Sequence, residues 1–83
     1  MKILYFAWLR TKTGIAEEDV DPPPSVSDVA ALVEWLKGRS DGHAAALADP
    51  RVVRVAVNQE FAQPETPVAP GDEIALFPPV TGG

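Results

Sequence analysis

Nine prolines restrict where this chain of 83 residues can form helices and strands. Proline has no backbone N–H and a fixed φ, so it interrupts helix interiors and central strands. The run Pro22–Pro24 therefore separates the N-terminal segment from the middle of the chain, and Pro50 ends the next segment. Three further prolines between residues 64 and 70 mark a connecting loop. Four segments remain that can be regular, namely 1–21, 25–49, 51–63 and 71–77.

The first segment predicts two strands. Lys2–Arg10 is apolar on both of its alternating faces, which is typical of a strand that is central or covered on both sides. Thr11–Gly14 predicts a turn, and Ile15–Asp21 predicts a more exposed strand that pairs antiparallel with the first as a hairpin. We expect the acidic run Glu17–Asp19 to be a solvated edge that discourages further strand pairing.

The second segment predicts the main helix. Apolar residues recur every three or four positions between Val29 and Leu36, as on one face of a helix. Ser25 or Ser27 is expected to cap its start, and Gly38 lies near its end.

The remaining segments predict a short helical turn and two more strands. The turn is expected at Ala44–Ala48, before Pro50. Val52–Asn58 is rich in β-branched residues, and Phe61 begins a short extension. Glu73–Phe77 is the last strand, with its alternate aliphatic residues on one face. The order β-β-α-β-β indicates an α+β domain, a mixed sheet packed on one main helix.

The composition excludes several classes of site. Without cysteine, the chain has no disulfide, cysteine nucleophile, thiolate zinc site or iron–sulfur cluster. The single histidine, His43, has no second histidine for a metal site and no partner for a catalytic triad. We expect His43 to be exposed in a loop or at the start of a helix.

Charge and hydropathy restrict the partners. The net charge is −5 and the seven basic residues form no stripe, so we expect no nucleic-acid partner and favour a basic protein surface. No apolar run is long enough for a membrane helix and no signal-peptide pattern is present, so we expect a cytoplasmic protein without membrane contact. A chain of this length forms one domain.

The most specific signal is the ending Pro78–Gly83. Two prolines after a strand favour extended geometry, so we expect a domain, 1–77, that carries a projecting tail, 78–83. Gly82 and Gly83 place no side chain beside the terminal carboxylate, which suits a narrow channel. That carboxylate is ionised at neutral pH and reacts only after activation, for example as an acyl-adenylate. An amine would then give an amide, and a sulfur donor a thiocarboxylate.

Four motifs resemble a known family. They are Phe6-Ala7-x-x-Arg10, Val57-Asn58-Gln59, Gly71-Asp72-Glu73-Ile74-Ala75 and Phe77-Pro78-Pro79-Val80-Thr81-Gly82-Gly83. With the order of elements, they cover essentially the whole chain. The chain resembles the ubiquitin-like β-grasp sulfur carriers, most closely the small subunits of molybdopterin synthase (MoaD type). The resemblance implies a ubiquitin-like β-grasp fold with an extended diglycine tail.

The resemblance also implies a reaction cycle at Gly83. An adenylyltransferase of the ubiquitin-activating type (MoeB type) adenylates Gly83 with ATP, and a sulfur donor such as a cysteine desulfurase or rhodanese makes the thiocarboxylate. The tail then enters the large subunit (MoaE type) and gives sulfur to cyclic pyranopterin monophosphate, forming the molybdopterin dithiolene of the molybdenum cofactor. The family works as a heterotetramer with its catalytic side chains in the large subunit. The resemblance therefore implies that this chain binds no cofactor or metal and is no enzyme on its own.

Partner contacts are expected around the tail. If the aliphatic residues of the last strand face the helix, Phe6 and Phe77 point outward from neighbouring strands and form an exposed apolar patch, with Arg10 beside it. The alternative is that both rings belong to the core. The family's partner contacts match Phe6, Arg10, Phe77, Pro78, Pro79, Val80 and Thr81.

Two other functions stay open at this point. One is a sulfur carrier of the same fold for thiamine, cysteine or tRNA thiolation. The other is a ubiquitin-like modifier joined to lysine amines, or a plain interaction module. The chain length and the ending Phe77–Gly83 favour molybdopterin synthesis.

Overall fold

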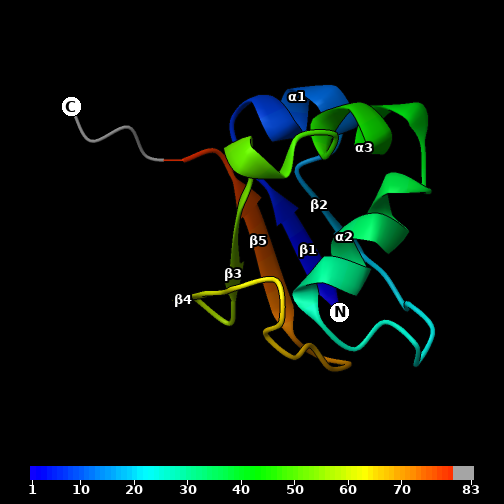
Figure 1. Ribbon diagram of the computed structural model, residues 1–83. Coiled ribbons are helices and arrows are strands. Elements are labelled where there is room, and N and C mark those ends of the chain that lie inside the picture. The colour runs from blue at the N-terminus through cyan, green and yellow to red at the C-terminus, as the bar shows by residue number, and fades with distance from the viewer. Residues whose placement is uncertain (80–83) are drawn as a thin grey trace.

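The computed structural model describes residues 1–79 of the chain. The elements are β1 (Lys2–Tyr5), α1 (Trp8–Thr13), β2 (Glu17–Asp19), α2 (Val29–Lys37), α3 (Asp41–Ala46), the 3-10 helix η1 (Pro50–Val52), β3 (Arg54–Val57), β4 (Glu60–Phe61) and β5 (Glu73–Phe77). They form a five-stranded mixed sheet in the order β2-β1-β5-β3-β4. The central strands β1 and β5 run parallel, whereas the outer pairs are antiparallel (Figure 1). The sheet therefore places the first strand beside the strand that precedes the tail, as predicted.

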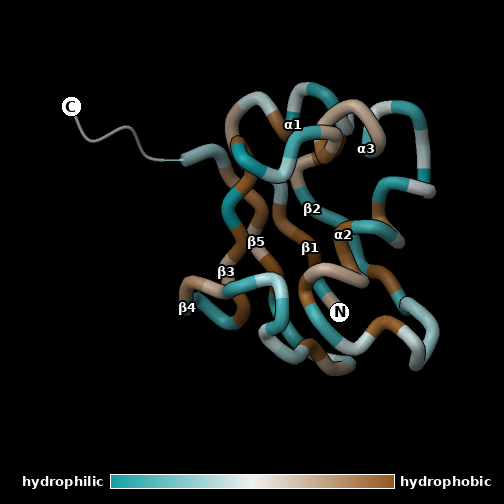
Figure 2. Tube along the Cα trace, in the orientation of Figure 1, coloured by the Kyte–Doolittle hydropathy of each residue, from teal (hydrophilic) through white to brown (hydrophobic). Residues whose placement is uncertain are grey.

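The core lies between the sheet and α2. Ile74 and Leu76, the inward-facing residues of β5, are fully buried, as their alternation predicted. Leu32 and Leu36 from one face of α2 are fully buried in the same cluster. Hydrophobic residues run along the central strands in Figure 2. Burying each such side chain contributes about 1.5–3 kcal/mol, which fixes the face of the sheet that meets α2.

The expected continuation of the first strand is wrong, because Trp8–Thr13 forms helix α1 instead of a strand end and a turn. Ala7 has a positive φ of 55°, which ends the extended run. The helix buries Leu9 and leaves Arg10 exposed. Gly14 closes the helix in the left-handed conformation, where its N–H donates to the Arg10 carbonyl oxygen. The first two strands do pair antiparallel, but a helix connects them instead of a tight turn.

Helix α2 is capped by Asp28 and not by either predicted serine, Ser25 or Ser27. The Asp28 carboxylate accepts a hydrogen bond of 2.8 Å from the Ala31 N–H. A carboxylate at this position satisfies a free N–H and interacts favourably with the positive end of the helix dipole. The helix ends at Gly38, as expected.

The predicted helical turn before Pro50 is α3, which begins earlier, at Asp41, and is capped by Ser40. Helix α3 packs closely against α1. A Cβ added at Gly42 would overlap the carbonyl oxygen of Lys12, so only glycine permits this approach of the two backbones.

The predicted strands after Pro50 are confirmed. Strand β3 is shorter than the predicted range 52–58, because Val52 belongs to η1, whereas β5 has the predicted bounds. Phe61, predicted to begin a short extension, belongs to β4. Among residues 1–79, no helix has both the length and the apolar character needed to cross a membrane.

Candidate functional site

Strand β5 leads directly into the tail. Pro78 and Pro79 are partly buried at the end of the sheet. Val80, Thr81, Gly82 and Gly83 lie outside the described residues, so the prediction of an extended diglycine tail stays a prediction. What the structure does describe is the surface at which the tail begins.

The predicted residues Phe6 and Phe77 lie at this surface. The Phe6 N–H donates to the Leu76 carbonyl oxygen at 3.0 Å, so the two phenylalanines lie at the same level of neighbouring strands. Phe6 is 48% exposed, and Phe77 is partly exposed. Neither ring belongs to the buried core. The core interpretation of both residues is therefore wrong.

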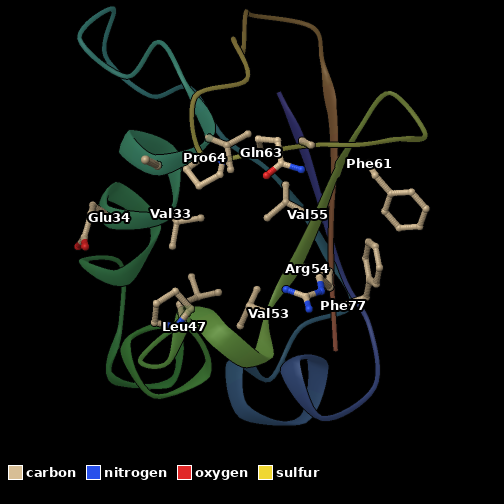
Figure 3. A pocket seen from close by; sticks show the side chains of 14 residues that line it. Val33, Glu34, Leu47, Val53, Arg54, Val55, Phe61, Gln63, Pro64 and Phe77 are labelled. Carbon is tan, nitrogen blue, oxygen red and sulfur yellow. The ribbon is translucent and has the colours of Figure 1, made fainter. Parts of the chain in front are cut away.

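Phe61 is a surface residue that the sequence analysis missed. It is 82% exposed, and its ring centroid lies 5.9 Å from that of Phe77. In the sheet, Phe61 pairs with Ala56 and Ala56 pairs with Ala75, two residues before Phe77 on β5. Figure 3 shows the Phe61 and Phe77 rings together on the side of β3 away from α2.

We call Phe6, Phe61 and Phe77 the exit surface. The sequence signal for Phe61 was the two-residue turn Asn58-Gln59. A hairpin with this turn pairs Phe61 with Ala56, so both side chains lie on the same face of the sheet. Exposed aromatic rings grouped on a small domain are typical of a partner interface.

Two arginines flank the exit surface. Arg54 pairs in register with Phe77, and the predicted residue Arg10 lies on the exposed side of α1. Neither side chain forms an ion pair with another residue of the described part of the chain. Both guanidinium groups are therefore available to a partner.

A groove of about 660 Å³ lies between α2 and β3, next to the exit surface (Figure 3). Its lining is mainly aliphatic, and its charged members are Glu34 and Arg54. The lining contains no histidine and no pair of carboxylates. The groove therefore offers a mainly apolar surface on which another chain can pack.

The prediction that His43 is exposed is wrong. His43 is 6% exposed, and its Nε2 lies 2.8 Å from Oε2 of Glu18. The same oxygen accepts a hydrogen bond of 2.7 Å from the Tyr5 hydroxyl, and Arg39 contacts the other carboxylate oxygen at 3.0 Å. Because an ionised carboxylate only accepts, the hydrogen-bond network assigns the Nε2 proton to His43. Ser40 then faces Nδ1 at 2.7 Å.

Glu18 is likewise not the solvated edge residue that we expected. Its side chain is 13% exposed, since Glu18 pairs with Ile3 and shares an inward face with Val20. Burial acts to raise the pKa of Glu18, but hydrogen bonds from His43 and Tyr5, with the Arg39 charge, outweigh burial and lower this pKa. Burial and the Glu18 hydrogen bond raise the pKa of Tyr5 far above its usual range. The cluster ties β1, β2 and α3 together and has no described opening to a substrate.

Within residues 1–79, no group of three or more histidine or acidic side chains is arranged to hold a metal ion. The exposed rings and the two arginines give the start of the tail an apolar and basic surface.

Comparison with known proteins places the chain in a family. The ThiS family model matches residues 3–83. The molybdopterin synthase sulfur carrier subunit of Escherichia coli (strain K12) is 39% identical over 83 residues, covering 100% of this chain and 99% of that protein. The human protein of the same name is 35% identical over 89 residues, covering 100% of this chain and 93% of that protein.

Solved structures agree with this assignment. SAMP1 from Haloferax volcanii is 32% identical with a TM-score of 0.76, covering 100% of this chain and 98% of that chain. A putative molybdopterin converting factor subunit 1 from Pyrococcus furiosus is 28% identical with a TM-score of 0.78, covering 95% of each chain. These neighbours confirm the ubiquitin-like β-grasp fold. The chain therefore belongs to the ThiS family.

Proposed function

We propose that this chain is the sulfur carrier subunit of a molybdopterin synthase and that Gly83 carries the sulfur. The observation that supports this function is the full-length identity with carriers of that name, 39% for the Escherichia coli protein. The ending Gly82-Gly83 and the absence of cysteine support the position of the sulfur, because the terminal carboxyl is then the group available to hold it.

The chemistry begins with activation of Gly83. An adenylyltransferase of the MoeB type joins the carboxylate to AMP from ATP and releases pyrophosphate. The outer sulfur of a donor persulfide attacks the acyl carbon and displaces AMP, which gives an acyl disulfide. A second thiol of the donor then reduces this S–S bond, which releases the thiocarboxylate and leaves the donor as a disulfide. In the large subunit, this sulfur passes to cyclic pyranopterin monophosphate, and the terminus returns to a carboxylate with oxygen from water. Two such transfers complete the dithiolene.

The large subunit (MoaE type) supplies the catalytic side chains in this proposal. The exit surface docks on that subunit, with Arg10 beside it, and Pro78–Thr81 of the tail contact the subunit where the tail enters. Support comes from the exposure of Phe6 and Phe61 at the start of the tail. Gly82 lets the tail pass a channel too narrow for a side chain.

Intact mass spectrometry tests the position of the sulfur. The chain is incubated with its activating enzyme, ATP and a sulfur source, and one oxygen is expected to be exchanged for one sulfur in the C-terminal peptide. Deleting Gly82 and Gly83 abolishes the exchange and leaves the melting temperature unchanged, because the sheet ends at Phe77. Sulfur found on any other peptide contradicts the proposal.

A second candidate function is protein modification. It is favoured by the likeness to SAMP1, since another solved structure of the Haloferax volcanii protein is described as a small archaeal modifier protein. The same activated Gly83 would then form an amide with a lysine amine. Isopeptide-linked adducts of the carrier in the cell, without thiocarboxylate-dependent synthesis of molybdopterin, would favour this function.

A further inference from the structure

The charged residues of the described chain are separated along the sheet. At the end where β1 and β5 begin, Lys2 pairs in register with both Glu73 and Asp19. Asp72 directly precedes β5 at this end. Glu60 lies at the same end, because it pairs with Val57, which pairs with Ile74 near the start of β5. We call these four carboxylates, Asp19, Glu60, Asp72 and Glu73, the acidic end. The one basic residue named at this end, Lys2, forms an ion pair with Glu17, with Nζ and Oε2 3.1 Å apart.

Figure 1 shows the opposite end of the sheet, where β5 passes into the tail. Three basic residues lie at this end. Arg54 begins β3 opposite Phe77, and α1 with Arg10 and Lys12 follows the end of β1. All three side chains belong to exposed residues. We call Arg10, Lys12 and Arg54 the basic end.

Ion pairing leaves the basic end charged. Four of the seven basic residues form ion pairs with carboxylates, namely Lys2, Lys37, Arg39 and Arg51. The three without such a partner in residues 1–79 are those of the basic end. Lys12 lies 6.0 Å from the Trp8 ring, a contact that leaves its charge in place. Asp41 begins the neighbouring α3, and Asp49 is held by Arg51.

We infer that the partner protein presents carboxylates around the mouth of the channel that receives the tail, facing Arg10, Lys12 and Arg54. This inference rests on the proposed function. The net charge of −5 alone favours a basic partner surface, but the end that carries the tail has the opposite sign. A protein is the occupant that fits. Arg54 pairs in register with Phe77, and Arg10 lies on the helix that follows Phe6, so positive groups stand next to exposed aromatic rings that need an apolar counterpart.

The separation of charge also orients the encounter. A partner with an acidic rim attracts the basic end and repels the acidic end, so the carrier arrives with its tail forward. Such steering raises association rates by about 10- to 1,000-fold and weakens with ionic strength. Rim charges act mainly on the association rate, whereas the buried apolar anchors act mainly on dissociation.

The experiment measures association rates with the large subunit from the same organism, using the full chain, at about 10 mM and about 500 mM salt. Arg54→Glu and Arg10→Glu are each expected to slow association by about tenfold at low salt and by much less at high salt. Lys37→Glu is the matched control, since it changes the net charge equally on α2, away from the basic end, and is expected to have a small effect. Circular dichroism verifies that each variant is folded.

Three results overturn the inference. The first is an equal effect of Lys37→Glu, which would mean that net charge alone sets the association rate. The second is an unchanged association rate for both arginine reversals. The third is faster association of the reversed variants, which would indicate a basic rim on the partner. In each case, the proposed function stands if the wild-type chain still forms the thiocarboxylate. Absence of both thiocarboxylate and binding in the wild type refutes the proposed function and, with it, the inference.

Discussion

Truncation of Phe61 separates the role of the exit surface in binding from any role in folding. Phe61 is 82% exposed, so Phe61→Ala withdraws only about a fifth of the contact area that a buried aromatic side chain provides. With about 200 Å² for such a side chain, the loss is about 40 Å², or about 1 kcal/mol of folding free energy. This corresponds to a fall in melting temperature of about 4–8 °C for a domain of this size. An aromatic anchor at an interface costs about 2 kcal/mol or more on truncation, which is about thirtyfold in affinity.

Leu76→Ala is the control. Leu76 directly precedes Phe77 on β5, but its side chain points into the core. Leu76 is fully buried, so its truncation is expected to cost about 2–5 kcal/mol of stability, with little effect on binding where the protein remains folded. Thermal unfolding followed by circular dichroism and titration calorimetry with the large subunit, at a temperature where both variants are folded, give the two quantities. If Phe61→Ala binds within threefold of the wild type, Phe61 is not part of the interface.

Two further predictions concern the elements that support this surface. Gly42→Ala is expected to destabilise the protein by about 1–3 kcal/mol, because its Cβ meets the Lys12 carbonyl oxygen, whereas helix propensity alone predicts a gain of about 1 kcal/mol. Gly38→Ala, where a Cβ makes only an ordinary contact, is the control, and a rise in melting temperature for Gly42→Ala refutes the close packing of α1 and α3. Glu18→Gln is expected to cost about 2 kcal/mol at pH 7 by weakening hydrogen bonds to a charged group. Because the folded pKa of Glu18 lies below its usual value of 4.5, its contribution is present above that value and lost as the pH falls below it. Urea titrations should therefore show the difference from the wild type shrinking below pH 4.5, and a constant difference contradicts the role of the charge.

The sequence predicted the parts of the fold that depend on local patterns. The alternation in Glu73–Phe77 placed Ile74 and Leu76 in the core, and the spacing of apolar residues located α2. Helix α1 escaped prediction because Trp8 and Leu9 are apolar under either periodicity, and the strand ends through the backbone conformation of Ala7. No pattern in the side chains signals a positive φ at an alanine.

The side-chain contacts that the sequence did not predict join residues that are distant in the chain. His43 and Glu18 are 25 residues apart, and each is an ordinary polar residue until the fold joins them. Phe61 reaches Phe77 only through the hairpin at Asn58-Gln59. Asparagine favours such a turn, but Gln59, with a positive φ of 70°, is a residue type that rarely adopts this conformation, so the signal in the sequence is weak. The chemistry expected of the diglycine ending needs no tertiary contact, so this prediction rests on the sequence alone.

The parallel pairing of β1 with β5 also determines how much of the chain must be present before the domain can fold. Lys2 pairs with Glu73, so nearly the whole chain must be present before the central pair of strands forms. Contacts of such wide sequence separation make folding slower than in helical domains of the same size. A chain interrupted before β5 leaves the edge of β1 unpaired and its apolar face uncovered, and such species are targets for aggregation and degradation. Every folded copy thus extends at least through Phe77. A chain that terminates before β5 does not fold, and it therefore does not block the partner with a carrier that lacks the tail.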